Sequence, residues 1–187
     1  MNLVNHFNDE EMKYIRLMCI LHTITKKYLL IAEEVAEDGE LFLQPLKEHR
    51  DAYDHLMRCY GIYIIDNKMS TEEKLRYEIE NLKKAFGHEY RAFFDTADWL
   101  TYILRKWIRL KLKSCGEEIC NKEFNNYSEI KLFINELPQK VAALREKKDV
   151  GNLSDNENSL VDEIEEYRKI LDQLIELKKN IALKIGL

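Results

Sequence analysis

The chain has 187 residues, of which 45% are apolar and 34% charged, and it contains only six glycines and two prolines. This length supports one well-buried core or a core with an appendage, and the scarcity of turn-forming residues excludes all-β and α/β folds. The formal net charge of −5 excludes a general attraction to nucleic acid or to an anionic membrane surface. We therefore expect an all-α protein.

The first two predicted helices cover residues 9–37 and a segment that runs to about residue 64. Asn8 is a suitable N-cap for the first, because acidic residues follow it, and Asp38-Gly39 supplies the stop signal. The second begins near Leu43 or Pro45, since proline is tolerated in a first helical turn. Both segments carry apolar residues at helical spacing, so we expect each to bury one face.

The third predicted helix begins at the capping box Ser70-Thr71-Glu72-Glu73 and continues to about residue 113. Its apolar residues recur at spacings of three and four, with two successive fours around Gly87. Such a slip rotates the apolar stripe, so the helix is expected to bend there. Residues 1–115 are thus predicted to form a bundle of three long helices.

Residues 116–127 are polar and are predicted to be an irregular connector, and residues 128–187 to form an antiparallel helical hairpin of coiled-coil type. Turn-forming residues at 149–156 separate its two arms. Pro138 either kinks the first arm or starts its second half, and Lys178 occupies a slot in the apolar seam. The predicted seam comprises Ile130, Ile134, Leu137, Val141 and Leu144 in one arm and Leu160, Ile164, Tyr167, Leu171, Leu174, Ile181 and Ile185 in the other.

The four cysteines lack zinc-finger spacing, so we expect reduced thiols and a cytoplasmic location. The N-terminus does not resemble a secretory signal, and no apolar stretch reaches the ~18–20 residues that span a bilayer. No membrane association is expected.

Two polar clusters interrupt the apolar pattern. Asp51 and His55 are four residues apart, so the carboxylate is expected to orient the imidazole. If the second and third helices pack antiparallel, the two clusters face one cleft. The clusters comprise His49, Arg50, Asp51, Asp54, His55 and Arg58 in the second helix and His88, Glu89, Arg91, Asp95 and Asp98 in the third.

A purely structural interpretation is also open, because Arg–Asp pairs are common on helix surfaces and contribute little when exposed. The same choice applies to the basic run at residues 105–113, which is either a solvated helix face or a local RNA-binding patch.

The segment Arg50-Asp51-Ala52-Tyr53-Asp54-His55 resembles the Arg-polar-x-x-x-His signature of the HEPN superfamily, which consists of all-α domains that include metal-independent ribonucleases of bacterial defence and toxin systems. The resemblance implies that Arg50 stabilises charge on an RNA phosphate and that His55 is the acid or base, in a homodimer that brings two such sets together. Asp51 holds the polar position of the motif, and Arg58, His88, Arg91 and Asp95 are expected to support the site or bind substrate. Arg16 and His22 fit a spacing one residue longer, but Leu17 follows that arginine.

Metal and cofactor chemistry are disfavoured. The sequence contains no Glu-x-x-His pairs for a di-iron bundle, and a site made of His55, His88, Asp95 and Asp98 would need a special geometry. We expect no cofactor and no metal. An alternative of another class is a non-enzymatic adaptor, in which residues 128–187 bind a protein partner.

Overall fold

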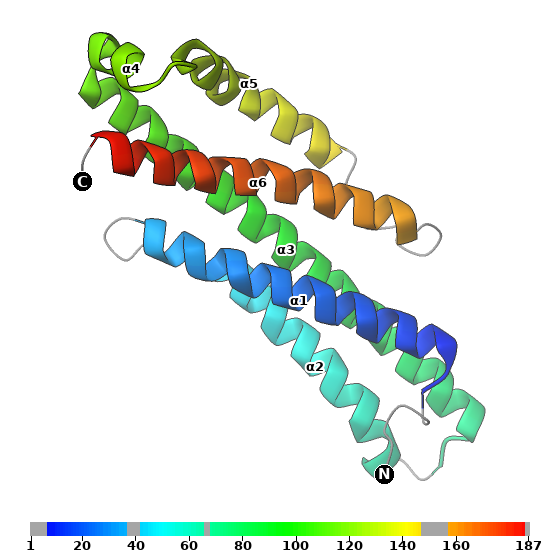
Figure 1. Ribbon diagram of the computed structural model, residues 1–187. Helices are drawn as coiled ribbons and strands as arrows, with labels where there is room; N and C mark the ends of the chain where they lie inside the picture. Colours follow the sequence, from blue (N-terminus) through cyan, green and yellow to red (C-terminus); the bar gives the residue numbers. More distant parts are fainter. Residues whose placement is uncertain (1–6, 37–41, 66–67, 147–156, 186–187) are drawn as a thin grey trace. The chain divides into compact units, whose positions relative to one another are not determined.

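The computed structural model describes residues 7–36, 42–65, 68–146 and 157–185, and all regular structure in these ranges is helical (Figure 1). This confirms the expected all-α class. The predicted stop at 38–39 and the predicted loop at 149–156 lie outside these residues. The helices are α1 (Asp9–Val35), α2 (Leu43–Ile65), α3 (Thr71–Cys115), α4 (Glu117–Glu123), α5 (Tyr127–Glu146) and α6 (Glu157–Ile185).

Two helices begin with reciprocal capping boxes. The backbone N–H of Glu11 donates to Asn8 Oδ1 at 2.9 Å, while Glu11 Oε2 accepts from the backbone N–H of Asn8 at 2.6 Å. At the start of α3, Glu73 and Ser70 bond in the same way, at 2.8 and 3.3 Å. Each box satisfies N–H groups that have no partner within the helix, and this explains why α1 and α3 begin where the sequence predicts.

The chain divides into two compact units, and the division falls within α3, between Thr96 and Ala97. The first unit holds most of α1, α2 and α3 up to Thr96, and the second holds the rest of α3 with α4, α5 and α6. The boundary expected at residue 115 is the end of the α3 helix.

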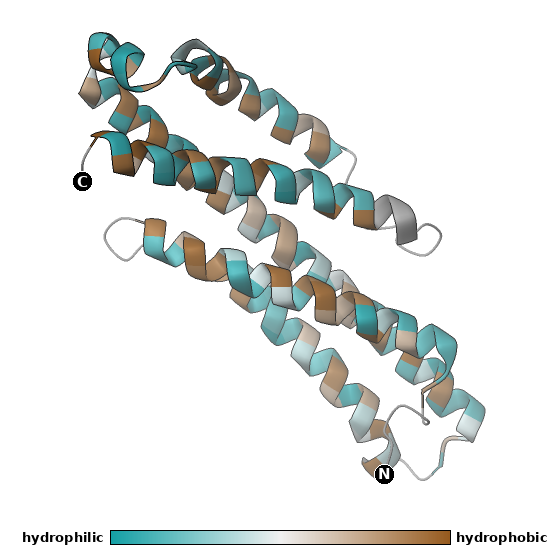
Figure 2. Cartoon of the chain, viewed as in Figure 1, coloured by the Kyte–Doolittle hydropathy of each residue, from teal (hydrophilic) through white to brown (hydrophobic). Residues whose placement is uncertain are grey.

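The core of the first unit is largely aromatic and is centred on α3. Phe86, Tyr90, Phe93 and Phe94 are buried, and the rings of Tyr90 and Phe94 lie 4.6 Å apart. Gly87 lies inside a continuous helix, and a Cβ added there would meet only the Arg91 guanidinium, at 3.6 Å. The apolar residues follow stripes along the helices (Figure 2).

The second unit buries most of the predicted seam, although Ile185 is only half-buried. All five seam residues of α5 are buried, as are Ile164, Tyr167, Leu171, Leu174 and Ile181 of α6; the side chain of Leu160 lies outside the described part. Lys178 places its amine 5.0 Å from the ring of Trp107 in α3, which explains a charged residue in a seam slot. Pro138 lies inside α5, exposed to solvent.

The connector contains a short helix, where irregular structure was expected at residues 116–127. Gly116 adopts φ 84°, a conformation that glycine reaches without steric cost, and the backbone N–H of Cys120 then donates to its carbonyl at 3.1 Å. Glu117 and Glu118 occupy the first turn of α4, where acidic residues stabilise a helix N-terminus.

Candidate functional site

The first unit contains an unusual number of buried polar side chains where α1 and α2 face α3. A buried polar group costs free energy unless it is paired, so each of these residues needs a partner or a chemical role. Apart from Thr25 and Thr96, whose hydroxyls donate to carbonyls four residues earlier in their own helices, the set consists of Glu11, Glu48, Glu78, Asn81 and Glu89.

Glu48 of α2 binds two residues of α3. Its Oε2 lies 2.8 Å from His88 Nδ1 and accepts from Arg91 Nε at 2.8 Å. Burial opposes ionisation of Glu48, but the hydrogen bonds from His88 and Arg91 outweigh it and hold the pKa below its ordinary value. The Arg91 Nη2 atom also lies 2.7 Å from His88 Nδ1. In a neutral ring, Nδ1 either carries a proton and donates to Glu48 or lacks one and accepts from Arg91, so it can bond only one of the two.

His55 is oriented by Asn81 of α3. Its Nδ1 lies 2.9 Å from Asn81 Oδ1, and the Asn81 amide donates to the carbonyl of Tyr77 at 2.9 Å. Because Asn81 therefore offers its oxygen to the ring, His55 must carry a proton on Nδ1, which leaves Nε2 as the acceptor in the neutral form. The ring stacks on His88, with centroids 5.4 Å apart and an interplanar angle of 23°.

Arg50 lies on the exposed side of this arrangement and binds Asp51. The Arg50 Nε and Nη2 atoms both donate to Asp51 Oδ1, at 2.9 and 2.7 Å. These bonds lower the pKa of Asp51 against a small opposing effect of burial, and the nearby His88 and His55 lower it further. Asp51 thus lies close to both rings. It was expected to orient His55, but the hydrogen bond that does so comes from Asn81.

The two predicted polar clusters therefore meet only in part. His55, His88, Arg91, Arg50 and Asp51 form one neighbourhood, which we call the His55 cluster. Arg58 instead pairs with Asp54 at 2.6 Å on the surface, and Asp98 binds Arg145 at 2.9 Å in the second unit. Asp95 is half-buried on α3.

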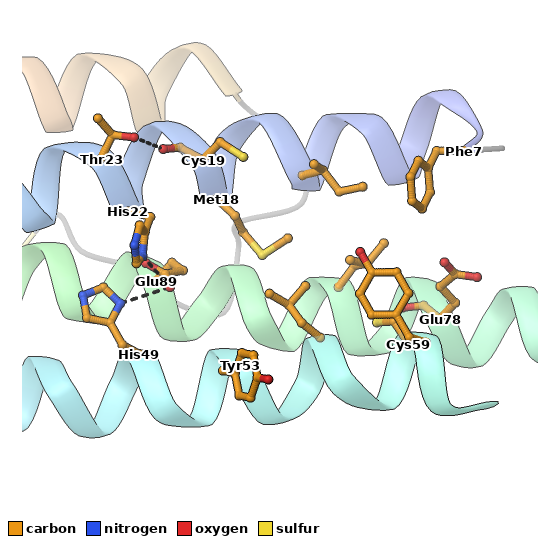
Figure 3. Close-up of a pocket in the computed structure, with 14 residues that line it drawn as sticks. Phe7, Met18, Cys19, His22, Thr23, His49, Tyr53, Cys59, Glu78 and Glu89 are labelled. Atoms are coloured by element: carbon orange, nitrogen blue, oxygen red, sulfur yellow. Dashed lines mark hydrogen bonds and ion pairs between the residues drawn. The ribbon is translucent and has the colours of Figure 1, made fainter. Parts of the chain in front are cut away.

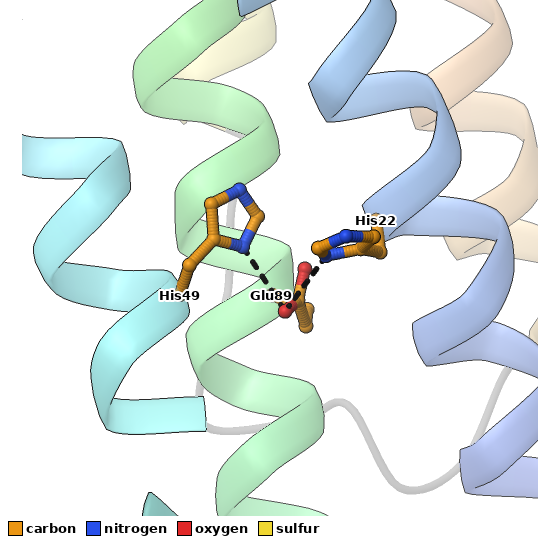
Figure 4. Close-up of side chains that lie close together, drawn as sticks. All are labelled: His22, His49 and Glu89. Carbon is orange, nitrogen blue, oxygen red and sulfur yellow. Dashed lines mark hydrogen bonds and ion pairs between the residues drawn. The ribbon is translucent and has the colours of Figure 1, made fainter. Parts of the chain in front are cut away.

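A second group lies nearby and was missed by the sequence analysis. The Nδ1 atoms of His22 in α1 and His49 in α2 lie 3.4 and 3.0 Å from Glu89 Oε1 in α3 (Figure 4). The other oxygen, Glu89 Oε2, is buried and has no hydrogen-bond partner among the residues that the structure describes. The signal for this group in the sequence is a pair of dipeptides forty residues apart, Glu48-His49 and His88-Glu89. In the structure, Glu48 of α2 contacts His88 of α3, and His49 of α2 contacts Glu89 of α3.

This second group lines a cavity of about 480 Å³ between α1, α2 and α3. His22, His49 and Glu89 lie toward one end of the cavity, and Cys59 and Glu78 toward the other (Figure 3). Burial raises the pKa of Cys59 to about 11, so its thiol stays protonated at neutral pH. Burial also raises the pKa of Tyr63, which donates to Glu78, to about 12.

Comparisons with protein-family models, with curated proteins and with solved structures found no match for this chain. Among the described residues, no helix has the length and apolarity needed to cross a membrane. The geometry of the two groups therefore carries the functional argument.

Proposed function

We propose that the protein binds RNA and cleaves its backbone without a metal ion, with His55 as the acid–base residue and Arg50 as the phosphate-binding cation. The observation that carries this proposal is the imidazole of His55, which Asn81 and His88 hold in one orientation beside the Arg50–Asp51 pair. The resemblance of the Arg50–His55 segment to the HEPN signature supports the same assignment.

The proposed chemistry depends on which ring nitrogen of His55 carries the proton. With Nδ1–H directed at Asn81, the free Nε2 can accept the proton of an RNA 2′-hydroxyl. The resulting oxygen attacks the adjacent phosphorus and breaks the bond to the 5′-oxygen, which takes a proton from water. The products are a 2′,3′-cyclic phosphate and a 5′-hydroxyl. DNA lacks the 2′-hydroxyl and cannot react in this way.

Local cations compensate for the negative charge of the whole chain. The Arg50 side chain is 72% exposed, and Arg91 is about half as exposed beside His88. A guanidinium binds phosphate through parallel N–H donors, and Arg50 would exchange Asp51 for a phosphate oxygen when RNA binds. Asp51 then remains beside His55 and His88.

An exposed row of residues on α2 favours the homodimer that the resemblance implies. It follows a heptad spacing of three and four and is exposed at six apolar positions, with Arg50 as the seventh member. Two copies that paired along this row would bring their Arg50 residues together. The row consists of Leu43, Leu46, Arg50, Tyr53, Met57, Tyr60 and Ile64.

The adaptor hypothesis receives less support from the geometry. The seam residues of α5 and α6 are buried within the second unit, so a protein partner at residues 128–187 would have to use other, exposed side chains such as Leu132.

The test is RNA cleavage by the purified protein in the presence of a metal chelator. Arg50→Ala and His55→Ala are each expected to lower the rate by roughly 10²- to 10⁴-fold, which is the range for loss of an acid–base or charge-stabilising group. Arg16→Ala is the matched control, because Arg16 is exposed and begins the stretch that fits the same motif one residue longer. Cleavage that needs a metal ion, or that survives His55→Ala, contradicts the proposal.

A further inference from the structure

We propose that His22, His49 and Glu89 bind one divalent transition-metal ion, and that Zn²⁺ fits this site best. The site lies apart from the His55 cluster, because Glu48 and His49 turn to different partners: Glu48 binds His88, and His49 binds Glu89. This metal site is additional to the RNA cleavage proposed above and does not depend on it.

Two of the three separations between donor atoms match those that a shared ion needs. Zinc lies about 2.0–2.1 Å from imidazole nitrogen and about 2.0–2.2 Å from carboxylate oxygen, so two such ligands at tetrahedral or right angles are roughly 2.9–3.4 Å apart. The Nδ1 atoms of His49 and His22 lie 3.0 and 3.4 Å from Glu89 Oε1, and the three donor atoms lie within 4.8 Å of one another. Small rotations of the rings would therefore suffice to coordinate an ion.

The unpaired oxygen of Glu89 is an independent indication. Glu89 is 6% exposed, and within the described part of the chain its Oε2 has no hydrogen-bond partner, although a buried carboxylate oxygen without one is costly. A divalent cation would compensate the carboxylate charge and could be coordinated by either oxygen. Two imidazoles and one carboxylate form a donor set that selects zinc or ferrous iron over Mg²⁺ and Ca²⁺, which prefer oxygen ligands.

The ligands come from three helices and leave room for another donor. His22 belongs to α1, His49 to α2 and Glu89 to α3, so the ion would connect all three helices of the first unit. Three protein ligands leave the fourth tetrahedral position open, as in catalytic zinc sites. Because all three residues line the cavity, we expect water to occupy this position, or a small molecule with one oxygen or nitrogen donor and an apolar body that contacts Met18 and Leu56.

Titration of the 187-residue chain with Zn²⁺ alone, followed by calorimetry, tests the site. We expect one ion per chain and a higher unfolding temperature when the ion is bound. His22→Ala is expected to weaken binding at least ~100-fold, since loss of an outer-shell partner alone typically costs about 10- to 100-fold. The His22 side chain is 56% exposed, so this variant should fold.

Three further variants and a Co²⁺ spectrum complete the test. Glu89→Gln should weaken Zn²⁺ binding to a similar degree, whereas Cys19→Ser in the cavity wall and His55→Ala in the neighbouring cluster should leave it unchanged. Co²⁺ in place of Zn²⁺ should give a visible spectrum without a thiolate charge-transfer band. Absence of one-to-one binding, equal affinity in the ligand variants, or a thiolate band would each overturn the proposal. The outcome of the RNA-cleavage assay in the presence of a chelator does not depend on these results, so the two proposals can fail separately.

Discussion

Glu78 shows at the scale of a single residue how burial sets the properties of this core. Its carboxylate accepts a hydrogen bond from Tyr63, and it is buried near Glu11. Burial raises its pKa above the ordinary value of 4.5, and the Glu11 carboxylate raises it further, while the bond from Tyr63 acts in the opposite direction. The ionised form of Glu78 is thus less favourable in the folded protein than in the unfolded chain.

Glu78→Gln is expected to stabilise the protein at pH 8 by about 1 kcal/mol, which is a shift in unfolding temperature of about 2–4 °C for a chain of this size. A raised pKa means that the favourable contribution of protonated Glu78 is complete below pH 4.5 and is lost as the pH rises through the folded-state value. The stabilisation should therefore disappear near pH 4. Thermal unfolding of both proteins across this range checks the prediction. Glu80→Gln, an exposed position on the same helix, should show no such pH dependence.

The sequence identified some residues of the two buried groups but not their partners. The spacing of four between Asp51 and His55 predicted a local pair, yet His55 bonds Asn81, which lies 26 residues away in α3. Local spacing rules describe one helix surface, whereas these contacts depend on the rotation of α2 against α3. His22 belongs to the Arg16–His22 pair, which Leu17 disfavours as a match to the motif. Its contact with Glu89, 67 residues further along the chain, leaves no local signal in the sequence.

At the scale of helices, apolar spacing and caps predicted the bounds of α1, α2 and α3 closely, and they also predicted both arms of the hairpin. The apolar positions of α2 were expected to line its buried face, but they are largely exposed, at Leu46, Tyr53, Met57, Tyr60 and Ile64. The helix α4 was not predicted, because its seven residues are too few to show a period. The sequence does not determine whether Pro138 lies within a helix or at the start of one, since a proline is compatible with a kink or with a helix start. The structure places it in the middle of α5.

Pro138→Ala is expected to stabilise the protein by roughly 1–3 kcal/mol. Proline in a helix interior costs about 3 kcal/mol relative to alanine, and part of this is offset because proline also restricts the unfolded chain. The residue is exposed, so its replacement removes little packing, and the new N–H can donate to the carbonyl four residues earlier. Urea unfolding measures the change. Gln139→Ala, at the next exposed position, is the control and should have a much smaller effect; an equal effect would contradict the role of the ring.

At the scale of the whole molecule, composition was sufficient to predict the fold class, but it could not predict the two units. Their division lies inside the 45-residue α3, where no glycine or proline marks it. The division depends on which helices pack beside each half of α3, and this is a tertiary property that a uniform helical period does not encode.

The oligomeric state provides the last prediction. The wild-type protein should sediment as a dimer, and Met57→Glu should sediment as a monomer, because a carboxylate in the exposed row on α2 would be buried without a partner at the dimer interface. RNA cleavage should decrease in the same variant if two His55 clusters act together. Leu132→Glu is the matched control, since Leu132 is also exposed but lies on α5 in the second unit. It should remain a dimer with unchanged cleavage. A monomeric wild-type protein, or a dimer that persists in Met57→Glu, would show that this row of α2 is not the dimer interface.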